Sequence, residues 1–383
     1  MTKVAHVCTS SFSHKILVDK LSILKDRGYD VHIVSSKEGY NEELMSKYHF
    51  QLRFINMNRK INLIDDLLSI VNMTRLFKKE QYTIVHTHTA KAGIIGRIAG
   101  RLAGIPVVIH TSHGLPFYEG QSKTKYHTYR SLEKIGALFC DAIASQNKED
   151  IEKIKQYAPQ KPIYYEGNGV DLHKLDQKNT QISQDQISLL KKQLNIPSNK
   201  KVILIGARLE PVKDHFFLLD GLRYLKENYN QNFICLLAGD GPLKQEILRT
   251  IQDNYLQGFV KLLGYQTDIY PFIKLADIVA LTSQKEGVPR IIMEAMAFSK
   301  PVVATNVLGT RELVIHNETG YLVEYKNVRE LAFYLNLMLT DEKKRIEFGI
   351  KGRKRVEKYF TEEVVVDRIV RMYNELLKKK CKN

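Results

Sequence analysis

The sequence has 383 residues, with 58 Lys and Arg against 42 Asp and Glu, which gives a formal net charge of +16 at pH 7. Its length predicts two domains, and its hydrophobic fraction of 44% is typical of globular chains that bury a core. No apolar run approaches the ~18 residues of a membrane-spanning helix, and no signal-peptide pattern opens the chain, so we expect neither an integral membrane protein nor a secreted one.

Apolar strands alternate with amphipathic helices along the first 170 residues. Strands are predicted at residues 3–8, 30–36, 50–56, 82–88, 106–114, 140–145 and 162–170. Helices are predicted at residues 14–28, 63–79, 92–104 and 124–137. Because the strands are continuous apolar runs, the pattern predicts a parallel sheet with helices on both faces, a Rossmann-like α/β domain over residues 1–170.

The same pattern begins again after a polar segment. Residues 171–198 show no strand pattern and are interpreted as a linker with some helix; a second Rossmann-like domain is predicted at 199–360, and a helix at 361–383 that crosses back to the first domain. Strands are predicted at 201–206, 233–239, 260–264, 277–281 and 301–305, with helices from about 213, from about 243 and at 289–298. Such sheets bind ligands at the carboxyl ends of their strands, so two facing domains predict one interdomain cleft.

Polar or glycine-rich segments follow four strands of the second domain. Arg208 and Lys213, in ARLEPVKD, suit a diphosphate, because a planar guanidinium and a mobile ammonium can surround two phosphoryl groups. A structural ion pair explains either residue as well. GDGP predicts a tight turn, and Gly264-Tyr265 offers backbone groups and a ring face to a nucleotide base.

The segment SQKEGVPRIIMEAMA carries two glutamates around a predicted helix start. Pro289 is placed near the first helical position, which leaves Glu286 in the preceding loop and Glu294 in the second turn. The helix N-terminus between them favours an anion, so the arrangement suits a phosphate flanked by hydroxyl groups, as in a nucleotide sugar. The alternative is that both glutamates serve capping and solubility.

Histidines follow two strands of the first domain, in VHTHTAKAG and IHTSHG. Such side chains can hydrogen-bond a sugar hydroxyl or a phosphate, and His113 is the preferred candidate because Gly114 permits close backbone approach. His86 and His110 fall within strand ends and are interpreted as structural. No metal site is predicted, since no HxxxH spacing accompanies them.

These motifs resemble the glycosyltransferases of family 4. The resemblance lies in GARLEPVKD, AGDGP, LLGYQTDI, NETGYLV and the long segment ADIVALTSQKEGVPRIIMEAMAFSKPVVATNVLGTRELV, with NGVD at 168–171. It implies the GT-B fold, an acceptor-binding first domain and a donor-binding second domain. It also implies retaining transfer of a sugar from a nucleotide donor, usually without a metal or other cofactor.

The resemblance also implies roles for single residues. Arg208 and Lys213 would bind the diphosphate, Glu294 the ribose hydroxyls, Glu286 the donor sugar, and His113 the donor sugar near the reacting centre. The segment after Glu286 would contact the sugar and phosphates, namely Gly287, Val288, Pro289 and Arg290. On the acceptor side the expected residues are Ser11, Ser13, His88 and Lys91.

One segment departs from the family pattern. Many members have a glycine-rich loop after the first strand, where this chain has TSSFSHK. Ser10, Ser11 or Ser13 would have to replace the glycines. The same absence argues against a dinucleotide-dependent oxidoreductase, which needs GxGxxG there.

The predicted function is therefore a retaining glycosyltransferase that moves a hexose or N-acetylhexosamine from UDP to a glycan or polyprenyl-linked acceptor in cell-surface polysaccharide synthesis. Same-face attack is favoured over double displacement, because no carboxylate in the first-domain motifs is an obvious nucleophile. A sugar-nucleotide epimerase of the same fold and a basic nucleic-acid-binding protein are the alternatives; no nucleic acid is expected as a partner.

A cytoplasmic location is expected, because Cys8, Cys140, Cys235 and Cys381 show no disulfide or zinc spacing. The segment 53–101 contains nine Lys and Arg against three Asp and Glu, and PFYEGQSKTKYHTYR mixes aromatic with basic residues. Both patterns predict peripheral contact with an anionic membrane on its inner face. The alternative is that the basic residues complement a helix C-terminus and that Tyr126 and Tyr129 belong to the core.

Overall fold

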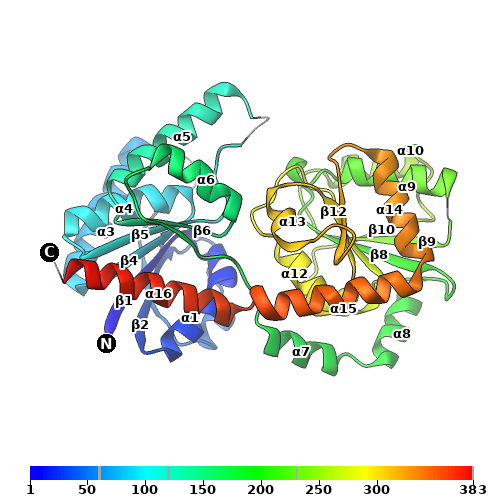
Figure 1. Ribbon diagram of the computed structural model, residues 1–383, viewed down its shortest axis with the longest axis horizontal. Helices are drawn as coiled ribbons and strands as arrows, with labels where there is room; N and C mark the ends of the chain where they lie inside the picture. Colours follow the sequence, from blue (N-terminus) through cyan, green and yellow to red (C-terminus); the bar gives the residue numbers. More distant parts are fainter. Residues whose placement is uncertain (59–61, 119–120, 230, 382–383) are drawn as a thin grey trace. The chain divides into compact units, whose positions relative to one another are not determined.

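The computed structural model describes residues 1–58, 62–118, 121–229 and 231–381. The chain forms two compact units (Figure 1): unit 1 comprises Met1–Asn168 and Glu362–Asn383, and unit 2 comprises Gly169–Thr361. Each unit contains one parallel sheet with helices packed on its faces, which confirms the predicted Rossmann-like α/β architecture. In the described part of the chain, no helix has both the length and the apolar character needed to cross a membrane.

Unit 1 contains a seven-stranded sheet of order β3-β2-β1-β4-β5-β6-β7. Its strands are β1 (Thr2–Ser10), β2 (Tyr29–Ser36), β3 (Gln51–Phe54), β4 (Ile84–His88), β5 (Val107–Ser112), β6 (Ala142–Ser145) and β7 (Ile163–Tyr165). Its helices are η1 (Ser11–Ser13), α1 (His14–Asp26), α2 (Glu42–Ser46), α3 (Leu63–Glu80), α4 (Ala90–Ala103), α5 (Lys123–Leu138), α6 (Lys148–Tyr157) and α16 (Glu362–Lys380). All predicted strands and helices of this unit are present, and α2 and α6 were not predicted.

The two-residue period of the strands divides the core of unit 1 between the two faces of its sheet. Val4 and Cys8 of β1 pack with α1 and α16, whereas Ala5 and Val7 pack with α3 and α4. The C-terminal helix α16 lies beside α1 in Figure 1 and buries Val365, Ile369 and Tyr373 in this core. Residues from the two ends of the chain therefore share one face of the sheet.

Unit 2 contains a six-stranded sheet of order β10-β9-β8-β11-β12-β13. Its strands are β8 (Lys201–Gly206), β9 (Phe233–Ala238), β10 (Val260–Gly264), β11 (Ile278–Leu281), β12 (Val302–Thr305) and β13 (Gly320–Val323). The helices before β11 are α7 (Leu172–Gln181), α8 (Gln184–Gln193), η2 (Pro211–Lys213), α9 (His215–Asn228), α10 (Lys244–Asp253) and α11 (Tyr270–Leu275). Those after it are α12 (Arg290–Ala297), α13 (Leu308–Leu313), α14 (Val328–Thr340) and α15 (Glu342–Tyr359).

The segment interpreted as a linker is instead folded into unit 2. Residues 171–198 form α7 and α8, and Leu175, Ile182, Ile187 and Ile196 are buried in the same core as β8 and β11. The prediction of a linker was wrong because the segment is mostly polar, and its four buried apolar residues are too widely spaced to form a clear pattern. A short amphipathic helix needs only one buried residue in each turn, and the rest of its surface is solvated.

Each sheet has one switch point, where the chain changes the direction in which it adds strands. In unit 1 the switch lies between the paired strands β1 and β4, and in unit 2 between the paired strands β8 and β11. Open parallel sheets bind ligands outside the carboxyl ends of the strands at such points, because the loops there diverge and leave a crevice. The segments that follow these four strands are therefore the candidate ligand-binding segments.

Candidate functional site

The loops after β8 and β11 meet at the switch point of unit 2. The amide of Gln284 donates to the carbonyl of Val212 at 2.9 Å, and the hydroxyl of Thr282 donates to the carbonyl of Asp214 at 3.2 Å. These bonds hold the segment after β11 against η2. We call the resulting group the β8–β11 site; it comprises Arg208, Lys213, Ser283, Glu286, Arg290 and Glu294.

Glu286 lies at the centre of the β8–β11 site. Its Oε1 accepts from Nζ of Lys213 at 2.6 Å and from the hydroxyl of Ser283 at 2.6 Å, and the residue is only 8% exposed. A carboxylate removed from water in this way needs a counter-charge, which Lys213 supplies. Arg208 differs, since its side chain is 70% exposed and pairs with Glu210 at 2.6 Å.

The second glutamate of the motif lies on α12, as predicted. Pro289 is the N-cap and not the first helical residue, and it makes no side-chain cap hydrogen bond. Glu294 is buried in the second turn, and its Oε1 accepts from Nε of Arg290 at 3.4 Å. A helix N-terminus with a cation in its first turn favours an anion between the two glutamates.

The turns after β9 and β10 complete the edge of this sheet. The amide of Gly239 donates to the carbonyl of Gly264 at 2.8 Å, and Gly264 has a φ of 69°, a conformation that favours glycine. Tyr265 follows immediately and is exposed. The structure therefore offers an accessible aromatic ring at the position predicted to meet a base.

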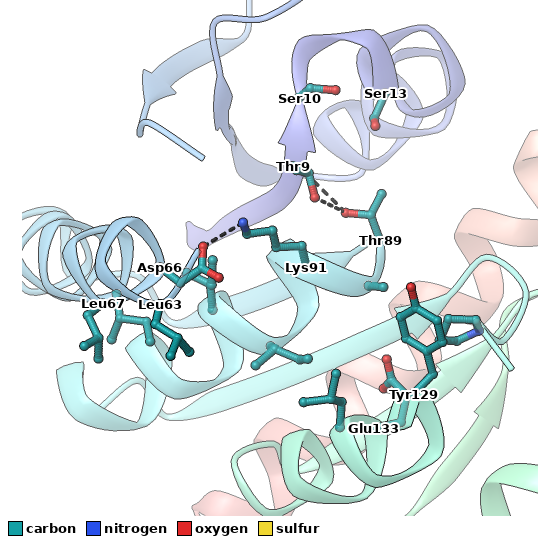
Figure 2. Close-up of a pocket in the computed structure, with 16 residues that line it drawn as sticks. Thr9, Ser10, Ser13, Leu63, Asp66, Leu67, Thr89, Lys91, Tyr129 and Glu133 are labelled. Atoms are coloured by element: carbon teal, nitrogen blue, oxygen red, sulfur yellow. Dashed lines mark hydrogen bonds and ion pairs between the residues drawn. The ribbon is translucent and has the colours of Figure 1, made fainter. Parts of the chain in front are cut away.

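A cavity of about 610 Å³ lies at the switch point of unit 1 (Figure 2). Its polar wall includes Ser10, Ser13 and Lys91, and its apolar wall includes Leu63 and Leu67 of α3. A 2.6 Å ion pair between Nζ of Lys91 and Asp66 appears as a dashed line in Figure 2. We call this space the β1–β4 cavity.

Two of the residues predicted on the acceptor side do not line the β1–β4 cavity. Ser11 is buried, and its hydroxyl donates to the carbonyl of Ser36 at 2.7 Å. His88 is also buried, and its ring hydrogen-bonds His6 and His113. Sequence position placed both residues at strand ends, but the direction of each side chain depends on the local backbone.

His113 follows β5 and lines a smaller cavity of about 50 Å³ with Thr111 and Gly114. Burial lowers the pKa of His113 to about 4, so the ring is neutral near pH 7. His86 and His110 are buried and hydrogen-bonded, as expected of structural residues.

Sequence reasoning missed a buried ion pair behind these histidines. Nζ of Lys20 lies 2.7 Å from Oε1 of Glu166, and both side chains are almost completely buried. No sequence signal could have paired them, because Lys20 is on α1 and Glu166 follows β7.

Two family profiles match the chain. The family described as "Glycosyl transferases group 1" matches residues 186–355, and the one described as "Glycosyl transferase 4-like" matches residues 4–147. The chain is 29% identical to the Escherichia coli UDP-Gal:alpha-D-GlcNAc-diphosphoundecaprenol alpha-1,3-galactosyltransferase, over 96% of this chain and 97% of that protein. It is also 29% identical to the capsular polysaccharide biosynthesis glycosyltransferase CapM of Staphylococcus aureus, over 98% of each chain.

Solved structures share the fold. Alr3699/HepE of Anabaena, in complex with UDP and glucose, has a TM-score of 0.82 and 23% identity over 98% of this chain and 100% of its own. A glycosyltransferase from Rickettsia africae ESF-5 has a TM-score of 0.83 and 21% identity over 98% of this chain and 99% of its own. The predicted GT-B fold is confirmed by these neighbours.

Proposed function

This chain belongs to the family 4 glycosyltransferases, and we propose that it is a retaining enzyme that transfers a hexose or N-acetylhexosamine from UDP to a lipid-linked or glycan acceptor in cell-surface polysaccharide synthesis. The observation that carries the donor assignment is the β8–β11 site. A lysine, two buried glutamates and a helix N-terminus converge at the switch point of unit 2. That set of groups matches a diphosphate flanked by hydroxyls.

In this proposal Arg208 and Lys213 bind the diphosphate, Glu294 the ribose hydroxyls and Glu286 the donor sugar. Positive charge at the diphosphate stabilises the leaving group as its bond to the sugar breaks. The long, exposed side chain of Arg208 is suited to reach a ligand. Because a lysine has a flexible four-carbon stem, the ammonium of Lys213 can contact a phosphate while it stays close to Glu286.

The β1–β4 cavity supports same-face attack over double displacement. The two carboxylates that line it are both held by cations: Asp66 by Lys91 at 2.6 Å and Glu133 by Arg97 at 3.0 Å. A carboxylate paired in this way is a poor nucleophile. Attack by the acceptor hydroxyl from the face that the diphosphate leaves requires no protein nucleophile.

The function is tested by incubating the full-length protein with UDP-sugars and an undecaprenyl-diphosphate-linked sugar, and by measuring UDP release and the anomeric configuration of the product. Release of UDP that depends on the acceptor supports the proposal. Conversion of the UDP-sugar without an acceptor, followed by NMR, would instead identify an epimerase. Inversion at the anomeric carbon would overturn the retaining mechanism.

Gly309 of α13 provides a test of the donor site. A Cβ at this position would lie 1.8 Å from the carbonyl oxygen of Gly287, so Gly309→Ala must displace the backbone next to Glu286. We expect at least a tenfold loss of UDP affinity by calorimetry, about 1.4 kcal/mol. The matched control is Gly258→Ala, where the added Cβ meets no atom within 4 Å. Equal UDP affinities of the two folded variants would exclude the loop after β11 from the donor site.

An exposed apolar stripe extends from the β1–β4 cavity along α3. Leu63 and Leu67 line the cavity, and the neighbouring Ile64 and Leu68 are 71% and 56% exposed. Exposed apolar groups of this size on a helix are typical of a surface that contacts lipid. The stripe supports our proposal that the lipid tail of the acceptor lies along α3, with the protein bound peripherally to the membrane.

The aromatic residues predicted to contact the membrane differ in exposure. Phe117 is buried, which excludes its ring as an interfacial anchor, and Tyr126 and Tyr129 are partly buried against the core of unit 1, as the alternative interpretation expects. Tyr118 is half-buried. The basic residues Arg59 and Lys60 of the segment 53–101 lie outside the described residues. The membrane proposal therefore rests on α3.

The double variant Ile64→Asp/Leu68→Asp should reduce binding to anionic vesicles at least tenfold, because two apolar side chains each contribute about 1.5–3 kcal/mol when they leave water. Sedimentation with phosphatidylglycerol vesicles measures this. The matched control is Ile346→Asp/Ile350→Asp on α15, where the two residues have the same spacing and are 55% and 48% exposed. Equal losses in both variants would exclude a specific role for α3.

A further inference from the structure

Four histidines of unit 1 form a row, of which three are buried and the outermost, His113, is half-buried. His6 lies on β1 between Val4 and Cys8, so the two-residue period directs it to the face covered by α1 and α16. His86 and His88 follow Ile84 on β4 and share that face.

The row is continuous in hydrogen bonds. Nε2 of His113 lies 2.9 Å from Nδ1 of His88, and Nε2 of His88 lies 3.0 Å from Nδ1 of His6. The hydroxyl of Tyr373, from α16, lies 3.3 Å from Nε2 of His6 and 2.7 Å from Nδ1 of His86. Each of these ring nitrogens thus has a partner.

At its inner end the row of histidines is hydrogen-bonded, through Thr111, to the charged carboxylate of Glu166. Nε2 of His86 lies 2.6 Å from the hydroxyl of Thr111, which donates to Oε2 of Glu166 at 2.6 Å. Oε1 of Glu166 accepts from Lys20 at 2.7 Å. Lys20 and the Thr111 hydroxyl bond lower the pKa of Glu166 despite its burial, so this carboxylate only accepts hydrogen bonds.

The direction of every bond follows from Glu166. Since Thr111 uses its single proton on Glu166, its oxygen must accept from Nε2–H of His86. A neutral His86 then has an unprotonated Nδ1, which accepts the proton of Tyr373. Burial lowers the pKa of His6, His86 and His88 well below the usual value, so the rings are neutral.

The hydrogen bonds between Tyr373 and His113 are oriented in the same way. The oxygen of Tyr373 accepts from Nε2–H of His6, so Nδ1 of His6 accepts from Nε2–H of His88. Nδ1 of His88 in turn accepts from Nε2–H of His113. Nδ1 of a neutral His113 is left as an acceptor, and none of the described residues hydrogen-bonds it.

We propose that the Lys20–Glu166 pair, relayed through Thr111, Tyr373 and three histidines, fixes His113 as its Nε2–H tautomer and so makes it an obligate acceptor for a substrate hydroxyl. The tautomer assignment stands on the hydrogen-bond chain alone; its consequence for catalysis rests on the proposed function. A neutral Nδ1 without a proton repels phosphate oxygens, which are also acceptors, and binds a sugar hydroxyl. The relayed groups are positioning residues, because they act only through His113.

The hydroxyl of Tyr373 is the best group to remove in a test, because it links His86 to His6 in the series of hydrogen bonds. Without its hydroxyl, the three outer histidines can reverse together: His6 donates from Nδ1 to His88, His88 donates from Nδ1 to His113, and His113 presents an Nδ1–H. Both directions make the same two internal bonds. Tyr373→Phe should therefore convert one tautomer of His113 into a mixture.

A metal ion is the competing explanation for part of the row. Ligand atoms of His6, His86 and His88 lie within 4.8 Å of one another. The hydrogen bonds described above already occupy both ring nitrogens of each residue, which favours the hydrogen-bonded chain.

The experiment is long-range ¹H–¹⁵N NMR of the full-length protein labelled with ¹⁵N-histidine, which distinguishes protonated from unprotonated ring nitrogens. His113 is assigned by comparison with His113→Asn. We expect a single Nε2–H tautomer of His113 in the wild type and in the control Tyr29→Phe, whose ring contacts Tyr373 edge-on. We expect a mixture in Tyr373→Phe and in Thr111→Val, and the single tautomer again in Thr111→Ser.

An Nδ1–H tautomer in the wild type, an unchanged tautomer in Tyr373→Phe, or a stoichiometric metal ion in the purified protein would overturn the proposal. These readouts need no substrate, so they remain valid if the transfer assay fails. Where transfer is measurable, Tyr373→Phe should lower kcat about tenfold, as loss of an orienting hydrogen bond commonly does, and Tyr29→Phe should not. An equal kcat for both variants would show that the tautomer of His113 does not affect catalysis.

Discussion

Lys213→Ala is expected to lower turnover by ~10²–10³-fold, the usual effect of removing one group that stabilises charge in the transition state. Nζ of Lys213 is 2.6 Å from Glu286, at the switch point where a diphosphate would bind. The measurement is the rate of UDP release at saturating donor. Lys226→Ala is the matched control, because Lys226 lies in the same unit, donates to the carbonyl of Tyr255 and lies over the Phe259 ring, with no contact to the β8–β11 site among the described residues.

A purely structural role of Lys213 would also reduce the rate, since its loss leaves the buried carboxylate of Glu286 without a counter-charge. The double variant Lys213→Ala/Glu286→Gln separates the two explanations when affinity for UDP, which carries no sugar for Glu286 to bind, is measured by calorimetry. If Lys213 only neutralises Glu286, the second substitution should restore the UDP affinity that Lys213→Ala loses. If Lys213 binds the diphosphate, the double variant should bind UDP as weakly as Lys213→Ala, and we expect this result. Recovery to near the wild-type affinity would contradict the diphosphate assignment.

Acid should destabilise unit 1 by at least ~8 kcal/mol between pH 7 and pH 5, the sum over four fully buried histidines that bind protons only when unfolded. His14 and His113, whose pKa burial lowers to about 4, add to this loss. Burial holds the pKa of His6, His86, His88 and His110 well below 6.5 in the folded chain. In the unfolded chain their pKa returns to about 6.5. The unfolded state therefore takes up more protons as the pH falls through 6.5, and stability falls with it.

Carboxylates affect the free energy of unfolding in a lower pH range than histidines do. The pKa of Glu166 is lowered in the folded chain, so its contribution to stability is complete above its unfolded pKa of about 4.5 and is lost only below that value. A loss of stability between pH 6.5 and 5 thus reports the histidines. In unit 2 the described residues include one comparable ring, His215, whose pKa burial lowers to about 4.

Urea unfolding at a series of pH values, followed by circular dichroism because the chain contains no Trp, measures the free energy of unfolding. Hydrogen exchange resolved along the sequence assigns the loss to a unit. We expect unit 1 to lose protection at a higher pH than unit 2. A free energy that is constant between pH 6.5 and 5, or equal losses in both units, would contradict the burial of neutral histidines.

The two parallel sheets and most residues of the β8–β11 site could be predicted from the amino-acid sequence. Apolar runs of five or six residues, such as those at 202–206 and 233–238, identify buried strands without knowledge of their neighbours. Arg208, Lys213 and Glu286 lie in the segments that follow such runs, and Glu294 lies on the helix after the segment of Glu286, so the strand-end rule indicated all four before any contact was known. Both the apolar runs and the polar residues after them are patterns of neighbouring residues, so they can be recognised without the tertiary structure.

Which of these groups come into contact could not be predicted, because it depends on the order of the strands in the sheet. The strand order that brings β8 beside β11 joins Lys213 to Glu286 across 73 residues of sequence. It also directed Ser11 and His88 away from the cavity and placed α7 and α8 in the core of unit 2. The hydrogen-bond chain behind His113 depends most on the fold, because Tyr373 reaches His86 from 287 residues away. Hydrophobic periodicity specifies which face of a strand or helix is buried, but not which distant element covers that face, and that choice is made by packing.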